Sequence, residues 1–170
     1  MTIHTTITSP LGDLLLVGKE SAAARGGFTL TSLSFLGQRN ARRPDRDSRR
    51  APAAFAEVQR QLEGYFAGDL QRFDLDSTTG GTPFQEQVWA ALDVVPYGTS
   101  TTYGHLAELL GAPRSALRAI GSAIGANPLL IVRPCHRVVG ADGSMTGYAG
   151  GTERKQFLLS HEGALQPLLV

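Results

Sequence analysis

The chain of 170 residues contains a single cysteine, Cys135, and the next residue is His136. A lone thiol cannot form an internal disulfide, so Cys135 is either a small buried hydrophobe or a nucleophile. As a nucleophile it would require a base, because a free thiol is mostly protonated at neutral pH. The imidazole of His136 is a candidate base, but neighbouring side chains of an extended segment point apart. We therefore expect a bridging water between the thiol and the imidazole.

The segment before the thiol must position it, and its first element is a clearly marked helix. Thr82 is suited to the N-cap, Pro83 to the first helical position, and Gln85 completes a capping box. These residues predict a helix from Pro83 to about Val94, which ends before Pro96. The side chains expected to be buried are Phe84, Val88, Ala91 and Leu92.

Two shorter helices are expected next, over 103–110 and 114–125, with a turn containing glycine and proline at 111–113. This is the outline of a helix-turn-helix, although any pair of antiparallel helices gives the same pattern. Apolar side chains form only a narrow stripe on the second helix, at Leu117, Ile120 and Ile124. Its other positions are mostly alanine, glycine and serine, which allows either DNA or a neighbouring helix to approach closely.

Charge is unevenly distributed along the chain. The formal net charge is +1, so the overall balance does not indicate a nucleic-acid partner. No acidic residue occurs between Glu108 and Asp142, yet this stretch contains Arg114, Arg118, Arg133 and Arg137. Such a local excess suits an anionic partner such as phosphate, or else a solvated basic face.

Apolar runs, the N-terminal residues and the number of cysteines indicate where in the cell the protein resides. No apolar run approaches the ~20 residues of a membrane-spanning helix, and the N-terminus lacks the basic start and apolar run of a signal peptide. One unpaired cysteine is typical of a reducing environment. We therefore expect a cytoplasmic protein without membrane association.

Residues 1–78 are expected to form a separate small domain, because a Ser/Thr/Gly-rich segment at 77–82 is a good boundary. The expected strands are Thr5–Ile7, Leu14–Val17, Phe28–Leu36 and Phe73–Leu75. A helix is expected from Pro52 to Gly68, with Phe55, Val58, Leu62 and Phe66 on its buried face.

Residues 37–50 are expected to be a polar loop. Five of its arginines either contact nucleic acid or are simply solvated: Arg42, Arg43, Arg46, Arg49 and Arg50.

The blocks around the cysteine resemble, in order and spacing, the O6-alkylguanine-DNA alkyltransferases. These blocks are Asn127-Pro128, the apolar run 129–132, Pro134–Arg137, Arg137–Gly140, Gly147–Gly151 and His161–Gly163. The resemblance covers about residues 82–163, and the first eighty residues match only loosely. It implies an α+β (α/β) protein, with an N-terminal ribonuclease-H-like structural domain at 1–78. A mostly helical alkyltransferase and DNA-binding domain with a helix-turn-helix would follow at 79–170.

The resemblance implies an activity as well. Such proteins transfer the alkyl group of O6-alkylguanine, and of O4-alkylthymine, from DNA to the residue matching Cys135. The thioether product is stable, so each molecule reacts once. The partner would be double-stranded DNA, bound through its minor groove by a protein that is monomeric when free. No cofactor is implied, and we expect no metal because the chain lacks the cysteines of a zinc site.

Family roles carry over residue by residue. Glu162 would hold His136, which acts through a water on Cys135, as in a triad with a water inserted. Tyr103 would donate a proton to the leaving guanine and help to swing out the nucleotide, and Asn127 would brace the turn that carries the cysteine. The backbone and walls of the substrate pocket would come from Val138, Tyr148, Ala149 and Gly150.

The same resemblance assigns the DNA contacts. Arg118 matches an arginine that enters the base stack where the damaged nucleotide leaves. The small residues Ala119 and Ser122 would face the narrow minor groove, and Arg114 would lie at the start of the same helix.

Two positions depart from the family pattern. Arg133 stands where Val or Ile is usual, so we expect it either to reach DNA phosphate or to pair with an acid, since a buried unpaired arginine is unfavourable. The chain also has one extra residue between Pro113 and Arg118.

Three other functions compete with alkyl transfer. A recognition protein for alkylated DNA would need no cysteine. A cysteine hydrolase built on Cys135 would have no use for a helix-turn-helix. A methylation-sensing regulator would need a further activation domain.

Overall fold

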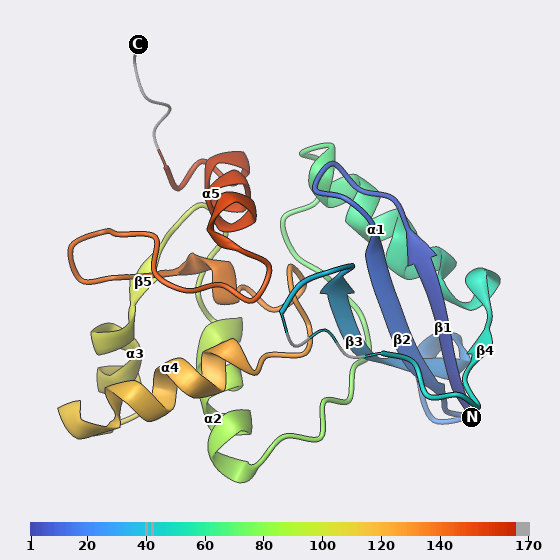
Figure 1. Ribbon diagram of the computed structural model, residues 1–170, viewed down its shortest axis with the longest axis horizontal. Helices are drawn as coiled ribbons and strands as arrows, with labels where there is room; N and C mark the ends of the chain where they lie inside the picture. Colours follow the sequence, from blue (N-terminus) through green and yellow to red (C-terminus); the bar gives the residue numbers. More distant parts are fainter. Residues whose placement is uncertain (40, 42, 166–170) are drawn as a thin grey trace. The chain divides into compact units, whose positions relative to one another are not determined.

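The computed structural model describes residues 1–39, 41 and 43–165, and Arg42 of the predicted arginine-rich loop lies outside these residues. The chain divides into two compact units, Met1–Thr79 and Gly80–Val170 (Figure 1). Helices and a small sheet make it a mixed α+β protein, as the sequence predicts. No helix among the described residues is long and apolar enough to cross a membrane.

The first unit contains a four-stranded sheet in the order β3-β2-β1-β4. The expected strands at the N-terminus are confirmed, with β1 at Thr2–Ile7, β2 at Leu14–Glu20 and β3 at Phe28–Phe35. Their pairings are antiparallel, with a register shift at Val17/Gly18.

Strand β4, Arg49–Arg50, lies in the segment expected to be a loop and pairs in parallel with Ile3 and His4 of β1. The loop prediction was therefore wrong at its end. The reason is that an edge strand with two exposed side chains requires no apolar pattern.

The helical segment of this unit begins with a 3-10 turn, Pro52–Phe55, and continues as α1, Ala56–Phe66. Phe55 packs edge-on against Phe28 of β3, with ring centroids 5.0 Å apart. The buried aromatic residue at the end of α1 is Tyr65 and not Phe66 as predicted. Tyr65 lies seven residues after Val58, almost two full turns, and is thus better aligned with the buried face.

The strand predicted at Phe73–Leu75 does not form. Instead the side chain of Gln61 bonds to both backbone groups of Asp74, donating to its O at 3.0 Å and accepting from its N at 2.8 Å. A single parallel bridge joins Leu30 to Ser77. The backbone of Asp74 therefore bonds to the side chain of the buried Gln61 and not to a neighbouring strand.

The second unit begins with α2, Pro83–Asp93, and its predicted capping box is confirmed. The Thr82 hydroxyl accepts from the backbone N of Gln85 at 3.1 Å, and the Gln85 side chain accepts from the backbone N of Thr82 at 3.0 Å. The predicted buried face was wrong at Phe84, which is 38% exposed, and it omitted Trp89, which is fully buried. The indole of Trp89 donates to the backbone O of Ala123 at 2.8 Å, so contact with another helix decides which aromatic residue is buried.

The helix-turn-helix outline is present in this unit. Helix α3 spans Tyr103–Leu109, and the turn contains Gly111 with a φ of 65°. The second helix begins with a 3-10 turn, Arg114–Ala116, and continues as α4, Leu117–Gly125. Ile120 and Ile124 are buried on α4, whereas Leu117 is only half-buried.

Three short elements complete the unit and place the chemistry. Strand β5, Thr101–Thr102, pairs in parallel with β6, Val138–Val139. The 3-10 turn Cys135–Arg137 immediately precedes β6, and the last helix, α5, spans Thr152–His161. The β5–β6 pairing therefore joins the start of α3 to the end of the cysteine turn.

Candidate active site and DNA-binding surface

The cysteine segment is a buried 3-10 turn and not an extended strand, so the expectation of an extended segment was wrong. Just before it, Ile131 has a φ of 69°, which is unusual for a β-branched residue, and the backbone N of Val132 donates to the O of Leu130 at 2.7 Å. Such a conformation costs about 1–3 kcal/mol and persists only where surrounding structure enforces it. The turn is thus held by its neighbours.

Cys135 is buried, at 3% exposure, and its sulfur accepts a hydrogen bond from Asn127 Nδ2 at 3.2 Å. Burial raises the pKa of the Cys135 thiol to about 11, while the Asn127 bond and the cations of Lys155 and Arg133 act in the opposite direction. The resting form is therefore the thiol, and a reaction through sulfur requires a base.

Asn127 is buried and all its polar atoms are engaged. Its Oδ1 accepts from the backbone N of Leu129 at 3.0 Å and from Arg133 Nη1 at 3.3 Å. Its Nδ2 donates to the O of Leu129 at 3.3 Å as well as to the Cys135 sulfur. Because two donors face Oδ1, the amide is fixed with its N–H directed at the sulfur.

His136 and Glu162 form a completely buried pair, with Nε2 of the imidazole 2.8 Å from Oε2 of the carboxylate. Burial lowers the pKa of His136, although Glu162 opposes this shift. The ring is therefore neutral, with its proton on Nε2. Among the described residues, Nδ1 has no hydrogen-bond partner, which makes its lone pair available to accept a proton.

Arg137, which the sequence marked only as one of the basic residues near Cys135, is also part of the site. Its Nε donates to Glu162 Oε1 at 2.7 Å, its Nη2 to Oε2 at 3.1 Å, and its Nη1 to the backbone O of Val95 at 2.6 Å. Glu162, the residue after the last turn of α5, thus receives both His136 and Arg137. A bidentate arginine holds the carboxylate in place and keeps it charged.

Lys155 is a residue that the sequence reasoning missed. It lies on α5 with 0% exposure, and its Nζ donates to the backbone O of Thr146. Burial lowers the pKa of Lys155 to about 8. The signal in the sequence was its position, because Lys155 shares the i, i+3, i+4 spacing of the buried Leu158 and Leu159.

Arg133 pairs with an acid, which is one of the two outcomes expected for it. Its Nε lies 3.5 Å from Asp93 Oδ1, an ion pair without hydrogen-bond geometry. Its guanidinium carbon lies 5.0 Å from the centroid of the Trp89 ring. The partner Asp93 is half-exposed, and burial raises its pKa although the Arg133 cation opposes this.

The predicted substrate residues lie in β6 and in the loop before α5. Val138 and Gly150 are buried, whereas Tyr148 and Ala149 are half-buried. The Tyr148 ring is edge-on to the His136 ring, with centroids 6.5 Å apart. This contact brings the loop to the imidazole.

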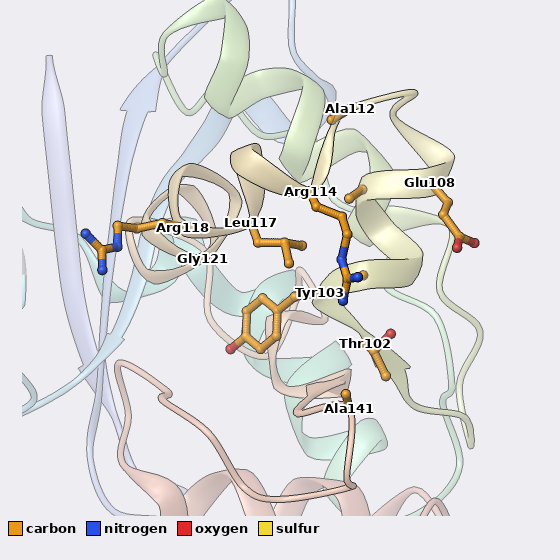
Figure 2. A pocket seen from close by; sticks show the side chains of 11 residues that line it. Thr102, Tyr103, Glu108, Ala112, Arg114, Leu117, Arg118, Gly121 and Ala141 are labelled. Carbon is orange, nitrogen blue, oxygen red and sulfur yellow. The ribbon is translucent and has the colours of Figure 1, made fainter.

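The predicted DNA contacts lie around a surface pocket of about 790 Å³ between α3, α4 and Ala141. Tyr103, Arg114 and Arg118 line it, and the Tyr103 hydroxyl accepts from Thr146 Oγ1 at 3.3 Å. Figure 2 shows Tyr103 near the centre, with Arg114 beside it, whereas the Arg118 guanidinium extends away.

The other two predicted contacts, Ala119 and Ser122, are exposed on α4 outside the lining of this pocket. Cys135 is not part of the lining either. The structure thus gathers two groups of predicted residues: a buried group around Cys135 and an exposed group on the helix-turn-helix. No cluster of three His, Cys, Asp or Glu side chains suited to a metal occurs among residues 1–39, 41 and 43–165.

Known proteins share both the fold and the site segment. The family model described as the 6-O-methylguanine DNA methyltransferase, DNA binding domain, matches residues 83–164. A methylated-DNA--protein-cysteine methyltransferase of Mycolicibacterium paratuberculosis is 44% identical over 165 residues, which cover 96% of this chain and 94% of that protein. The chain therefore belongs to the O6-methylguanine-DNA methyltransferase family.

Solved structures agree with this assignment. The crystal structure of the O6-methylguanine methyltransferase of Mycobacterium tuberculosis has a TM-score of 0.84 and 43% identity, covering 99% of this chain and 96% of that one. The Mycobacterium tuberculosis protein in complex with DNA gives a TM-score of 0.82 and 42% identity, covering 95% and 92%.

Proposed function

We propose that this protein repairs DNA by transferring the alkyl group of O6-alkylguanine to Cys135, once per molecule. The observation that carries the proposal is the buried pair of His136 and Glu162 beside the cysteine turn, with the imidazole Nδ1 lone pair available. Together with family membership, this supplies the base that a buried thiol with a raised pKa requires.

The reaction is written as one displacement. The Cys135 S–H proton passes through a bridging water to His136 Nδ1, and the imidazolium that forms is stabilised by Glu162. The sulfur bonds to the alkyl carbon as the bond from that carbon to O6 breaks. The leaving guanine takes a proton from the Tyr103 hydroxyl; the phenolate then regains a proton from solvent, and the imidazolium of His136 gives its extra proton back to solvent. A thioether and an intact guanine result, and no step regenerates the thiol.

Substrate binding would use the two groups of residues described above. Arg118 would enter the base stack as the damaged nucleotide swings out toward Tyr103, while Ala119 and Ser122 lie against the minor groove. Arg114 would contact phosphate. In the pocket of the flipped base, Val138, Tyr148, Ala149 and Gly150 would provide the backbone contacts and walls. O4-alkylthymine is proposed as a second substrate.

The remaining proposals concern the setting of the reaction. We place the protein in the cytoplasm as a monomer, where a single free thiol stays reduced. Residues 1–78 would form a ribonuclease-H-like structural support for the reactive domain at 79–170. The Mycobacterium tuberculosis relative was crystallised with DNA, which supports double-stranded DNA as the partner. A recognition protein without chemistry is not favoured, since the cysteine is present and the relatives carry methyltransferase names.

A titration of repaired sites tests the proposal. A duplex with O6-methylguanine inside a restriction site is incubated with increasing amounts of protein, and restored cleavage counts the repaired sites. We expect repaired sites to equal protein molecules and then to stop. Continued turnover, or no repair at any ratio, would reject single-use transfer.

A further inference from the structure

Arg133 is a buried cation that lies one contact away from the reactive sulfur. Its side chain is only 9% exposed, and its Nη1 donates to Asn127 Oδ1 at 3.3 Å. Asn127 in turn donates from Nδ2 to the sulfur of Cys135 at 3.2 Å. A short chain of contacts therefore connects the guanidinium to the nucleophile.

We propose that Arg133 is a positioning residue for alkyl transfer, which keeps the Asn127 N–H directed at the sulfur and favours the thiolate through its own charge. The proposal rests on the proposed function for its place in the reaction. The effect of Arg133 on the ionisation of the Cys135 thiol can nevertheless be measured without any DNA substrate.

The partners of the Asn127 amide decide its orientation. A side-chain amide can exchange its N and O positions by a half turn, and only its partners decide between the two. In Asn127 the Oδ1 receives the backbone N–H of Leu129 and the guanidinium N–H of Arg133. A half turn would set two donors against the amide nitrogen and leave the sulfur without a donor. Arg133 adds the second donor, which makes the productive orientation more favourable.

Arg133 also acts on the sulfur through its charge. The cations that act on Cys135 are Arg133 and Lys155 of α5, and both counter the burial that raises the pKa of the thiol to about 11. The anion nearest to Arg133 is Asp93 of α2, 3.5 Å away and half-exposed. His136 is neutral because burial lowers its pKa.

The remaining charges near the turn, Glu162 and Arg137, are bound to each other. Arg133 is therefore held inside the unit by the face of Trp89 and by one partly solvated carboxylate. Part of its field is left to act on the sulfur.

Three variants separate these effects. Arg133→Met removes the charge and the hydrogen bond while keeping an elongated side chain, Arg133→Lys keeps the charge alone, and Asp93→Asn removes the compensating anion. The thiolate is titrated by its ultraviolet absorbance, with Cys135→Ser in each background as the baseline, which is clean because the chain has one cysteine. In parallel, transfer from free O6-benzylguanine is timed between pH 7 and 9.

We expect Arg133→Met to move the thiolate titration upward by about half to one pH unit, because a cation near the sulfur is lost. Transfer from O6-benzylguanine then slows about three- to tenfold at a fixed pH below the titration. Arg133→Lys recovers part of both effects. Asp93→Asn shifts the titration downward and speeds transfer, since it removes an anion and leaves the cation in place.

Several results would overturn the proposal. An Arg133→Met protein that folds with an unchanged titration and an unchanged rate on the free base excludes both parts of the role. A loss confined to duplex DNA would instead make Arg133 a phosphate contact. If Arg133→Met fails to fold, Asp93→Asn alone decides. A thiolate titration of Cys135 that moves upward, or does not move, in Asp93→Asn contradicts the proposed effect of the Arg133 charge on the sulfur. A wild-type protein that titrates normally but transfers nothing would reject the proposed function and leave this test intact.

Discussion

The two units differ in where their charged side chains lie. In residues 1–79, ion pairs lie at the surface, as where Arg25 meets Asp74 and Asp76. Residues 80–165 also contain an exposed pair, His105 with Glu108, but five of their ionisable side chains are buried: Arg133, His136, Arg137, Lys155 and Glu162. Surface pairs contribute at most about 1 kcal/mol, whereas a buried charge that loses its partner costs several. Buried charge therefore occurs in the unit that carries the reactive cysteine, where it can act on the sulfur.

The largest effect is expected at the reactive sulfur itself. Cys135→Ala should abolish alkyl transfer, because no other thiol exists in the chain. Binding to duplex DNA, followed by fluorescence anisotropy, should remain, since the proposed DNA contacts lie on the helix-turn-helix, outside the buried group around Cys135. Loss of both binding and transfer would count against the role assigned to Cys135.

The next effect is expected at the buried carboxylate. Glu162→Gln removes the anion that holds His136 and Arg137, so it leaves the Arg137 cation buried without a counter-ion. The free energy of unfolding should fall by about 3 kcal/mol in urea titrations. Transfer from O6-benzylguanine should also slow by at least about tenfold, because a neutral amide cannot stabilise the imidazolium. Full activity in a folded Glu162→Gln protein would break the proposed relay.

Substitution of Arg118 separates the contribution of the exposed group on the helix-turn-helix from that of the buried group around Cys135. Arg118→Ala should slow repair in duplex DNA by about tenfold or more, because the side chain proposed to replace the flipped base is missing. Reaction with free O6-benzylguanine should change less than about twofold, since no base stack is involved. Equal losses on the two substrates would reject the role of Arg118 in the base stack.

A smaller and pH-dependent effect is expected at Lys155. Its pKa of about 8 means that it is charged below that pH and supports the thiolate, and that it becomes neutral above. Lys155→Met should therefore slow transfer several-fold at pH 7, with the ratio of wild-type to variant rates approaching one above about pH 9. A ratio that is constant with pH would mean that Lys155 acts only through packing.

The smallest effect is expected in the first unit and serves as the matched control. Arg25→Gln breaks the exposed pairs with Asp74 and Asp76. The free energy of unfolding should change little, because the exposed pairs are screened by solvent, and the rate of transfer should not change. A large loss of activity would contradict the proposal that the first unit serves only as a structural support.

Local signals in the sequence were sufficient for several elements. The capping box of Thr82 and Gln85 needs only residues within one turn, and short runs of strand-forming residues were enough to predict that β1, β2 and β3 exist. The strand at Arg49–Arg50 was missed because its partner, Ile3, is far away in the sequence. Likewise the carbonyl of Ala123, on another helix, determines that Trp89 is buried.

At the site, too, some residues could be predicted from the sequence, whereas others depend on contacts between distant segments. Family resemblance named Cys135, Asn127, His136 and Glu162, and the structure brings these residues into two hydrogen-bonded pairs. The cations that surround them could not be read in this way. The spacing of Lys155 with Leu158 and Leu159 indicates only that it faces inward, and its effect on the sulfur depends on how α5 packs. The pairing of Arg133 with Asp93 joins residues forty positions apart in the sequence.

Transfer of one alkyl group to Cys135 is measured as the mass of the intact protein after incubation with duplex DNA that carries O6-methylguanine. We expect a gain of one methyl group per molecule, located on Cys135 by peptide mapping, with no further gain at excess DNA. An unchanged mass despite selective binding to the lesion would contradict it and identify a recognition protein. A methyl group on any other residue would equally refute the assignment of Cys135.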